Sequence, residues 1–148
     1  MITNIIIAAM LAQVTFVSTN ADEPRIGFIL VRDSLVVVPV SLNGRGGYKL
    51  LLDTGATNSI LSIHVADQLG LPAQRHTTLL TAGGTLLVTV HTVKIMQIGN
   101  AQITDVHIAV AGVDLFQKLH VDGILGADYL KQFKVSIDYA HRTLTIKP

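Results

Sequence analysis

Short apolar runs interrupted by turn residues are the feature that most limits how this chain can fold. From Ile26 to the C-terminus, segments rich in Val, Ile, Leu and Thr alternate with turns that contain Gly, Asn or Asp. Runs of this length and composition form β-strands, because β-branched side chains suit extended backbone. The pattern therefore predicts an all-β fold with one or two short helices.

The expected strands are separated by recognisable turns. The strands are expected at residues 26–32, 35–42, 48–52, 74–80, 86–98 and 105–110, and a final hairpin at residues 134–146. Pro39 cannot donate to a strand ladder, so it predicts an edge or a bulge in the second strand. The glycine-rich residues 43–47 lack the Lys-Ser/Thr and the helix of a phosphate-binding loop, and we expect a hairpin turn there. Residues 114–120 fit either a helical turn or a loop.

Size and charge exclude several classes of protein. A chain of 148 residues, 49% apolar and 14% charged, is long enough for one compact domain with its own core. The formal net charge is +1 and no basic run occurs, so nothing indicates a nucleic-acid partner. The absence of cysteine excludes disulfides, thiol nucleophiles and Cys-based zinc sites.

The first residues resemble a secretory signal. Residues 5–17 are apolar except for Gln13 and Thr15, and Thr19-Asn20-Ala21 precedes two acidic residues. This stretch is shorter than the ~20 residues of a transmembrane helix. We therefore expect a signal peptide at residues 1–21, a domain at residues 22–148, and export to the periplasm or the medium. An uncleaved membrane anchor and a buried first strand are the alternatives, since no Lys or Arg precedes the apolar run; membrane contact is expected only for the anchor.

Asp53 is the first candidate for chemistry. It follows the apolar run Leu50-Leu51-Leu52 and opens the sequence Asp53-Thr54-Gly55-Ala56, after which apolar residues resume at Ile60. An ionised carboxylate beside apolar residues is costly unless it is hydrogen-bonded or paired. Asp53 is therefore either a turn residue that faces water or a functional group, and Asp-Thr-Gly alone does not decide between them.

Two later segments bear on this choice. Gly83 and Gly84 separate two extended apolar runs, which predicts a hairpin with a mobile tip. Farther along the chain, Asp122-Gly123-Ile124-Leu125-Gly126 again ends an apolar run at a glycine turn, and a short helix is expected at residues 128–132. Another short helix, capped by Ser62, is expected soon after Asp53.

Together these elements resemble the retropepsin-like (retroviral-type) aspartic proteases, most closely their single-lobe bacterial members. The resemblance runs from about Ile26 to the C-terminus. It implies a small, closed β-barrel-like acid protease lobe that requires neither cofactor nor metal. It also implies roles for individual residues: catalysis by Asp53, an active-site turn at Thr54, Gly55 and Ala56, a substrate-binding flap at Thr81, Ala82, Gly83, Gly84 and Thr85, and a structural brace at Ile124, Leu125 and Gly126.

The chain contains one Asp-Thr-Gly, whereas peptide hydrolysis by this chemistry needs two carboxylates that share a proton. The resemblance therefore implies a homodimer in which Asp53 faces its copy, with a peptide or protein as substrate. Because the family commonly joins terminal strands into one sheet, residues 144–147 and the segment after the signal are candidates for the dimer interface.

The sequence also allows other interpretations. The lobe could be a non-catalytic peptide-binding or interaction module that has kept the motif. The six histidines show no metal-ligand spacing and are expected on the surface or on strand faces, and Gly-x-Ser-x-Gly is absent. Asp122, Asp128 and Asp138 fit a turn, a helix cap and a solvent-facing position, and Ile124 and Leu125 are expected in the core rather than at a binding site.

Overall fold

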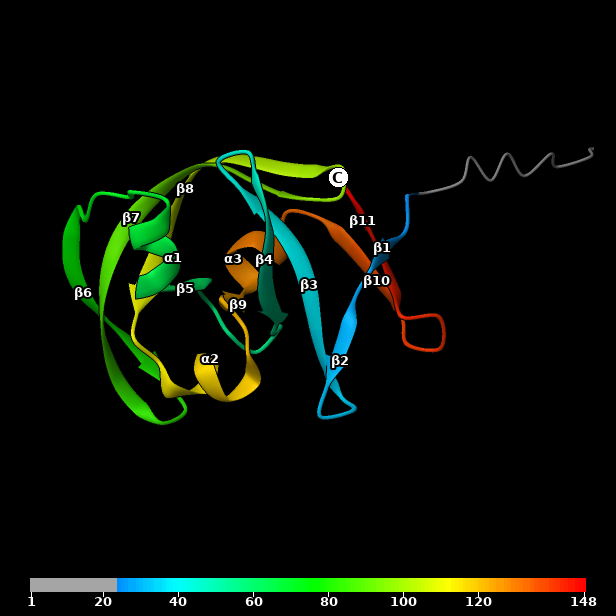
Figure 1. Cartoon of the computed structure of the whole chain (residues 1–148), viewed down its shortest axis with the longest axis horizontal. Helices are drawn as coiled ribbons and strands as arrows, with labels where there is room; N and C mark the ends of the chain where they lie inside the picture. Colours follow the sequence, from blue (N-terminus) through cyan, green and yellow to red (C-terminus); the bar gives the residue numbers. More distant parts are fainter. Residues whose placement is uncertain (1–23) are drawn as a thin grey trace, which may run out of the picture.

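Eleven strands and three short helices form the part of the chain that the computed structural model describes, residues 24–148 (Figure 1). The expected signal segment, residues 1–21, lies outside the described residues. The strands are β1 (Ile26–Gly27), β2 (Ile29–Val31), β3 (Leu35–Leu42), β4 (Arg45–Leu52), β5 (Ile60–Ser62), β6 (Arg75–Thr81), β7 (Gly84–Ile98), β8 (Ala101–Ala111), β9 (Gly123–Leu125), β10 (Lys134–Asp138) and β11 (Thr143–Lys147). The helices are α1 (Ile63–Gln68), α2 (Asp114–Leu119) and α3 (Ala127–Leu130). The all-β prediction is confirmed, with one helix more than expected because residues 114–119 form α2.

The larger sheet closes on itself. Its eight strands follow the order β2-β3-β4-β9-β5-β8-β7-β6, and an additional pairing of β3 with β7 joins Leu42 to Met96. This pairing closes a ring through β3, β4, β9, β5, β8 and β7, which confirms the barrel-like lobe. Two pairs in the ring, β4 with β9 and β5 with β8, are parallel, and the other pairs are antiparallel.

The position of β3 between two buried clusters explains why its sequence is apolar almost throughout. Val36, Val38 and Val40 point into the main core, whereas Val37 belongs to a second buried cluster with Leu51 and Ile60. Both faces of the strand are therefore buried, and the usual alternation with polar residues disappears. Each fully buried aliphatic side chain contributes on the order of 1.5–3 kcal/mol relative to exposure.

Local turn chemistry sets the β3–β4 hairpin. Asn43 and Gly44 both have positive φ, 51° and 78°, as a two-residue type I′ turn requires. The turn is thus shorter than residues 43–47, and β4 begins at Arg45 rather than Tyr48. Pro39 is exposed, lies beyond the end of the β2 pairing and precedes a register shift in β3, so its predicted edge or bulge position is confirmed.

A separate sheet, in the order β1-β11-β10, forms the end of the molecule away from β6 (Figure 1). The chain passes from this sheet to the barrel at Phe28, whose amide donates to the Arg142 carbonyl at 3.0 Å. Because of this crossing, the expected strand at residues 26–32 is divided into β1 and β2. None of the helices within residues 24–148 has the length and apolar character needed to cross a membrane.

Candidate active site

Asp53 is held at the end of β4 by three hydrogen bonds. Its amide donates to the Leu125 carbonyl at 3.0 Å, its own carbonyl accepts from the Ala56 amide at 3.2 Å, and its Oδ1 accepts from the Gly55 amide at 2.9 Å. The first bond follows from the parallel pairing of β4 with β9, which places Leu52 beside Leu125. The second carboxylate oxygen, Oδ2, has no hydrogen-bond partner among residues 24–148. The turn therefore fixes one oxygen and leaves the other available.

The start of α3 supports this turn from behind. The Ala127 amide donates to the Ala56 carbonyl at 2.8 Å, and the Asp128 amide donates to the Thr57 carbonyl at 3.2 Å. Gly126 lies so close to the turn that a Cβ atom there would stand 2.6 Å from the Asn58 carbonyl carbon and 2.9 Å from the Ala56 oxygen. The brace expected at residues 124–126 thus includes Gly126 and extends to Asp128.

Ser59 and Asp128 belong to the same support, and sequence reasoning missed this connection. The Asp128 carboxylate accepts hydrogen bonds from the Ser59 amide at 2.8 Å and the Ser59 hydroxyl at 2.6 Å. Asp128 also accepts from the amide of its neighbour Tyr129 at 2.9 Å. The expected helix-cap role of Asp128 is therefore wrong: the N-cap of α3 is Gly126, no side chain caps the helix, and Asp128 lies inside its first turn. The one sequence signal for this contact is the polar Ser59, which directly precedes the apolar residues Ile60 and Leu61.

A cavity of about 440 Å³ lies between the Asp53 turn and the tip of the β6–β7 hairpin. Asp53 is the one charged residue in its lining, which otherwise consists of neutral and apolar side chains: Gly55, Ala56, Thr57, Asn58, Ile60, Leu79, Leu80, Thr81, Ala82 and Ile124. Of the expected flap residues, Thr81 and Ala82 line the cavity, whereas Gly83, Gly84 and Thr85 do not.

Ile124 lines the cavity and also packs against the second core cluster. Strand β9 runs between β4 and β5, so successive side chains point to opposite faces. Leu125 is completely buried in the main core, and Ile124, which is half-buried, faces the cavity that contains Asp53. The expected core position is therefore confirmed for Leu125, whereas Ile124 packs against the second core cluster and lines the cavity as well.

Thr54 is exposed, and no hydrogen bond connects it to any other part of residues 24–148. It lies at a second, apolar cavity of about 300 Å³ beside β10. The turn thus presents Asp53 to one cavity and Thr54 to another.

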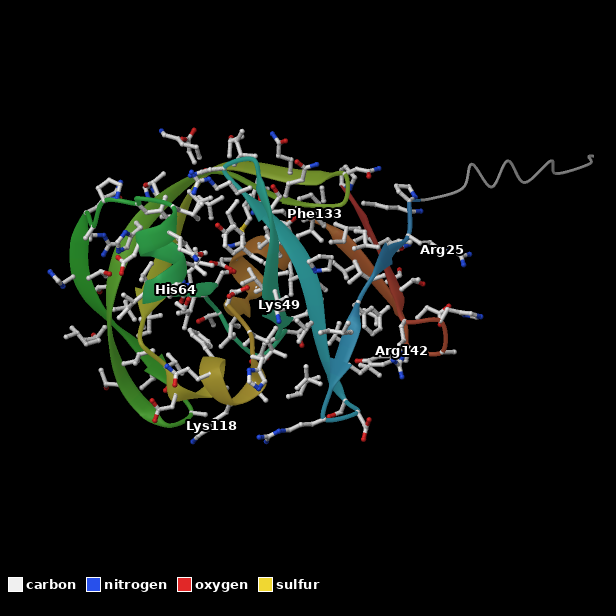
Figure 2. All side chains as sticks on the ribbon, viewed as in Figure 1. Arg25, Lys49, His64, Lys118, Phe133 and Arg142 are labelled. Atoms are coloured by element: carbon white, nitrogen blue, oxygen red, sulfur yellow. The ribbon has the colours of Figure 1, made fainter. Side chains whose placement is uncertain are left out.

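A larger cavity, of about 680 Å³, lies elsewhere. Its lining includes Lys49 of β4, His64 of α1, His120 and Asp122, and it does not include Asp53 (Figure 2). The Asp122 carboxylate accepts the Lys49 amide at 2.8 Å, so this aspartate, expected as a turn residue, joins the start of β9 to β4. Within residues 24–148, no group of three or more His, Cys, Asp or Glu side chains is arranged to hold a metal ion.

The histidines follow the expectation with one exception. His64, His76, His107, His120 and His141 are exposed. His91 is on a strand but only 6% exposed. Its Nδ1 donates to the Leu71 carbonyl at 2.9 Å, and its Nε2 lies 2.8 Å from the Thr89 hydroxyl oxygen. It is a satisfied core residue that ties the end of α1 to β7.

The Asp138 carboxyl and the Tyr129 phenol have shifted pKa values. Hydrogen bonds from the His141 amide and ring lower the pKa of the exposed Asp138 carboxyl. Burial raises the pKa of the Tyr129 phenol, whose hydroxyl donates to the Ala101 carbonyl at 3.0 Å. Asp138 is exposed, as expected. The hydrogen bond of the Tyr129 hydroxyl joins α3 to the start of β8.

Known proteins match both the sequence and the fold. The sequence profile of a family described as "Aspartyl protease" matches residues 38–129. The crystal structure of a retropepsin-like aspartic protease from Rickettsia conorii is similar with a TM-score of 0.60 and 26% identity, over 84% of this chain and 89% of that one. EIAV protease in complex with the inhibitor HBY-793 has a similar fold, with a TM-score of 0.53 and 22% identity over 70% of this chain and 92% of that one. No curated protein sequence matches the chain.

Proposed function

Because this chain belongs to the aspartyl protease family, we propose that it is a retropepsin-like aspartic endopeptidase whose catalytic unit is a homodimer. The observation that carries the proposal is the setting of Asp53. Its carboxylate is the one charged group in a cavity lined by otherwise uncharged residues, and its Oδ2 has no partner within residues 24–148. Such a carboxylate is free to bind a water molecule or a polarised carbonyl.

A second copy supplies the missing acid. Hydrolysis of a peptide bond by this chemistry uses two carboxylates, and the chain carries one Asp-Thr-Gly. Two carboxylates in contact cannot both be ionised comfortably, so the pair shares one proton. The exposed Thr54, which has no hydrogen-bond partner within residues 24–148, is a suitable group to bond across the two-fold axis and align the turns.

In the proposed reaction one Asp53 acts as general base and Asp53 of the other copy acts as general acid. The ionised Asp53 carboxylate accepts a proton from water, and the water oxygen attacks the peptide carbonyl carbon while the protonated Asp53 of the other copy donates to the carbonyl oxygen. The first Asp53 then passes the proton that it took from water to the amide nitrogen, the C–N bond breaks, and a hydroxyl of the tetrahedral intermediate returns its proton to Asp53 of the other copy. The Gly55 amide keeps Oδ1 in place, so the carboxylate need not reorient during the reaction.

The β6–β7 hairpin is suited to cover the substrate. An extended peptide can pair with exposed backbone near Thr81, and its side chains can enter the apolar cavity next to Leu79 and Ile124. Closure of the hairpin would exclude bulk water from the scissile bond. This assigns the hairpin the role of a flap.

The test is cleavage of an unbiased peptide mixture by the wild-type protein and by Asp53→Asn at about pH 4 to 7. The substitution keeps the size of the side chain and its Gly55 contact but removes the acid. We expect cleavage by the wild type and a loss of at least about 1,000-fold in Asp53→Asn. Equal cleavage by both proteins would refute the aspartic mechanism. Peptide binding without cleavage by either protein would favour the non-catalytic module.

We also propose export, on the strength of the N-terminal sequence. The apolar residues 5–17 and the small residues that follow support a cleaved signal, which would leave a mature chain that begins near Asp22. The check is the N-terminal residue of the protein purified from its natural source. A soluble intracellular protein that begins at Met1 would refute export, and a membrane-bound one would support the anchor.

A further inference from the structure

The cavity of about 680 Å³, called the larger cavity from here on, takes no part in the proposed reaction. Its walls come from three separate parts of the fold: β4, the region where the end of β8 meets the start of α1, and α2 with the turn that follows it. Ligand pockets of proteins have volumes of roughly 300–1,000 Å³, and the larger cavity falls within that range. The composition of its lining indicates which ligand it suits.

Part of this lining is apolar. Phe116 and Val121 are buried and belong to the second core cluster. Ile63 also lines the cavity, yet it is 51% exposed. A single exposed apolar residue is common on protein surfaces, but this one borders a cavity. An apolar ligand group placed there would remove the Ile63 side chain from water, which is favourable.

Three exposed side chains supply nitrogen atoms to the same cavity: Lys49 on β4, His64 on α1 and His120 at the C-cap of α2. His120 has a left-handed backbone with φ of 53°, a conformation for which glycine is the more usual residue at the end of a helix. Asp122 is the one carboxylate of the lining, and its Oδ2 accepts the Lys49 amide at 2.8 Å. One ammonium and two imidazoles therefore outnumber one carboxylate, and the excess of positive charge grows as histidines become protonated. Such a lining suits an anionic group.

The larger cavity and the catalytic cavity differ in the charge that they accept. Asp53 is the one charged residue that lines the catalytic cavity, so another carboxylate is repelled there. The paired strands β5 and β9 run between the two cavities. Ile60 and Ile124 line the catalytic cavity, whereas Ser62 and Asp122, at the other ends of these strands, line the larger one. A strand of this length spans about 7 Å, so the two cavities are close neighbours.

We propose that the larger cavity binds the C-terminal carboxylate of a peptide whose last residue is apolar. The Lys49 ammonium and the rings of His64 and His120 pair with the carboxylate, while the last side chain packs on Ile63. The inference rests on the proposed function for the source of this peptide, since every peptide bond that an aspartic endopeptidase hydrolyses leaves a new C-terminal carboxylate. The mostly apolar catalytic cavity favours an apolar side chain beside the scissile bond, so the released product carries both groups that the larger cavity suits.

The test compares one peptide in two chemical forms. A peptide of sequence Gly-Thr-Val-Leu, labelled with rhodamine at its N-terminus, carries either a free C-terminal carboxylate or a C-terminal amide, so the two forms differ only in the anionic group. Binding to the purified protein is measured by fluorescence anisotropy at low salt and about pH 6, where imidazole groups carry part of their positive charge and screening is weak. Mass spectrometry after each titration checks that the peptide is intact.

Four variants locate the bound peptide. Lys49→Gln removes a positive charge from the larger cavity, and Asp122→Asn removes the negative charge while it keeps the shape of the side chain. Lys94→Gln is the matched control for loss of an exposed lysine, because Lys94 pairs with Asp105 at 3.0 Å and does not line the cavity. Asp53→Asn removes the charge of the catalytic cavity and therefore detects a peptide that binds there.

We expect the wild type to bind the carboxylate form at least about tenfold more tightly than the amide form. Lys49→Gln should weaken binding of the carboxylate form at least about threefold, and Asp122→Asn should tighten it by a similar factor, because the first removes an attraction and the second removes a repulsion. Lys94→Gln and Asp53→Asn should each change the affinity by less than about twofold. Opposite effects of the two cavity variants also exclude a general loss of folding as their cause.

Equal binding of the two peptide forms, or no binding up to about 1 mM peptide, would overturn the inference. Equal effects of Lys49→Gln and Lys94→Gln, or a weaker complex with Asp122→Asn, would do the same. An Asp53→Asn protein that binds the carboxylate form more than about twofold more tightly would place the peptide in the catalytic cavity instead. Isocaproate carries a carboxylate and a leucine-like chain without a peptide. If it displaces the labelled peptide as effectively as the unlabelled peptide does, the ligand is a small apolar acid and the assignment to a peptide is wrong.

Failure of the proposed function gives a different result. If the two peptide forms and the cavity variants behave as expected but the wild type and Asp53→Asn cleave a peptide mixture equally, the larger cavity binds peptide C-termini and the aspartic mechanism is wrong. If Asp53→Asn is inactive in cleavage but both peptide forms bind the wild type equally, the mechanism stands and the larger cavity is not a site for its products.

Discussion

The Ser59 hydroxyl donates to Oδ1 of Asp128 at 2.6 Å and joins two segments that are 69 residues apart in the sequence. The same hydroxyl oxygen accepts the Gly126 amide at 2.9 Å, and Ser59 is only 1% exposed. One buried serine therefore connects the loop that follows Asp53 to the start of α3. The position of the candidate catalytic turn depends on this connection as well as on its own hydrogen bonds.

Ser59→Ala should destabilise the fold by about 1–3 kcal/mol, because it leaves the buried Gly126 amide without its acceptor and removes one of the two hydrogen bonds to Oδ1 of Asp128. Asp128→Asn should cost less, since it keeps the shape of the side chain and part of its accepting capacity. Urea unfolding at a fixed protein concentration measures both. Asp122→Asn is a matched control, because Asp122 also accepts a backbone amide, that of Lys49, but lies away from the Asp53 turn. A Ser59→Ala protein as stable as the wild type would mean that the connection contributes nothing.

Gly126→Ala should reduce peptide cleavage by at least about tenfold, because the new methyl group would displace the Asn58 and Ala56 carbonyls that lie behind the Asp53 turn. The backbone at Gly126 has φ of −101°, so the requirement for glycine comes from close approach rather than from a positive φ. Gly46→Ala is the control, because a Cβ there meets no atom within 4 Å. Equal losses in the two variants would show that the effect is not local to the turn.

Features set by sequence neighbours were predictable. The Asn43–Gly44 turn depends on residues that accept positive φ, and the Ser62 cap depends on a hydroxyl three residues before the Val65 amide that it accepts. The position of Asp53 after an apolar run likewise predicted an acid at a strand end. In each case the interacting groups lie within a few residues, so the sequence alone contains the necessary information.

Features set by strand order were not predictable in this way. Ile124 faces the cavity because β9 lies between β4 and β5, and His91 is buried because the segment at Leu71 crosses β7. The Ser59–Asp128 contact similarly requires α3 to reach the catalytic turn. A local pattern cannot reveal which of two faces of a strand will be covered when the covering segment is dozens of residues away.

Gly84→Ala should weaken substrate turnover more than Gly83→Ala does. Gly84 has φ of +112°, a conformation that strains any residue with a side chain, whereas Gly83 has no positive φ and a Cβ there would make only an ordinary contact with Thr81 Oγ1 at 3.8 Å. The sequence presents two adjacent glycines and does not distinguish them. We expect kcat/KM to fall severalfold for Gly84→Ala and to change little for Gly83→Ala, with similar far-UV circular dichroism. The opposite order would show that the hairpin tip adopts another conformation when substrate binds.

Asp138 should make the terminal hairpin sensitive to acid. The His141 amide, followed by its ring, lowers the pKa of the Asp138 carboxyl in the folded chain. A carboxyl with a lowered folded-state pKa stabilises the fold above its unfolded-state pKa, and this contribution is lost as the pH falls through the folded-state value. Asp138→Asn should therefore be less stable than the wild type near neutral pH, and the two urea-unfolding midpoints should converge at strongly acidic pH. Asp67→Asn on α1 is the control for removing an exposed carboxyl. Midpoints that remain equally far apart from about pH 7 to pH 2 would show that the difference comes from the turn geometry and not from the charge of Asp138.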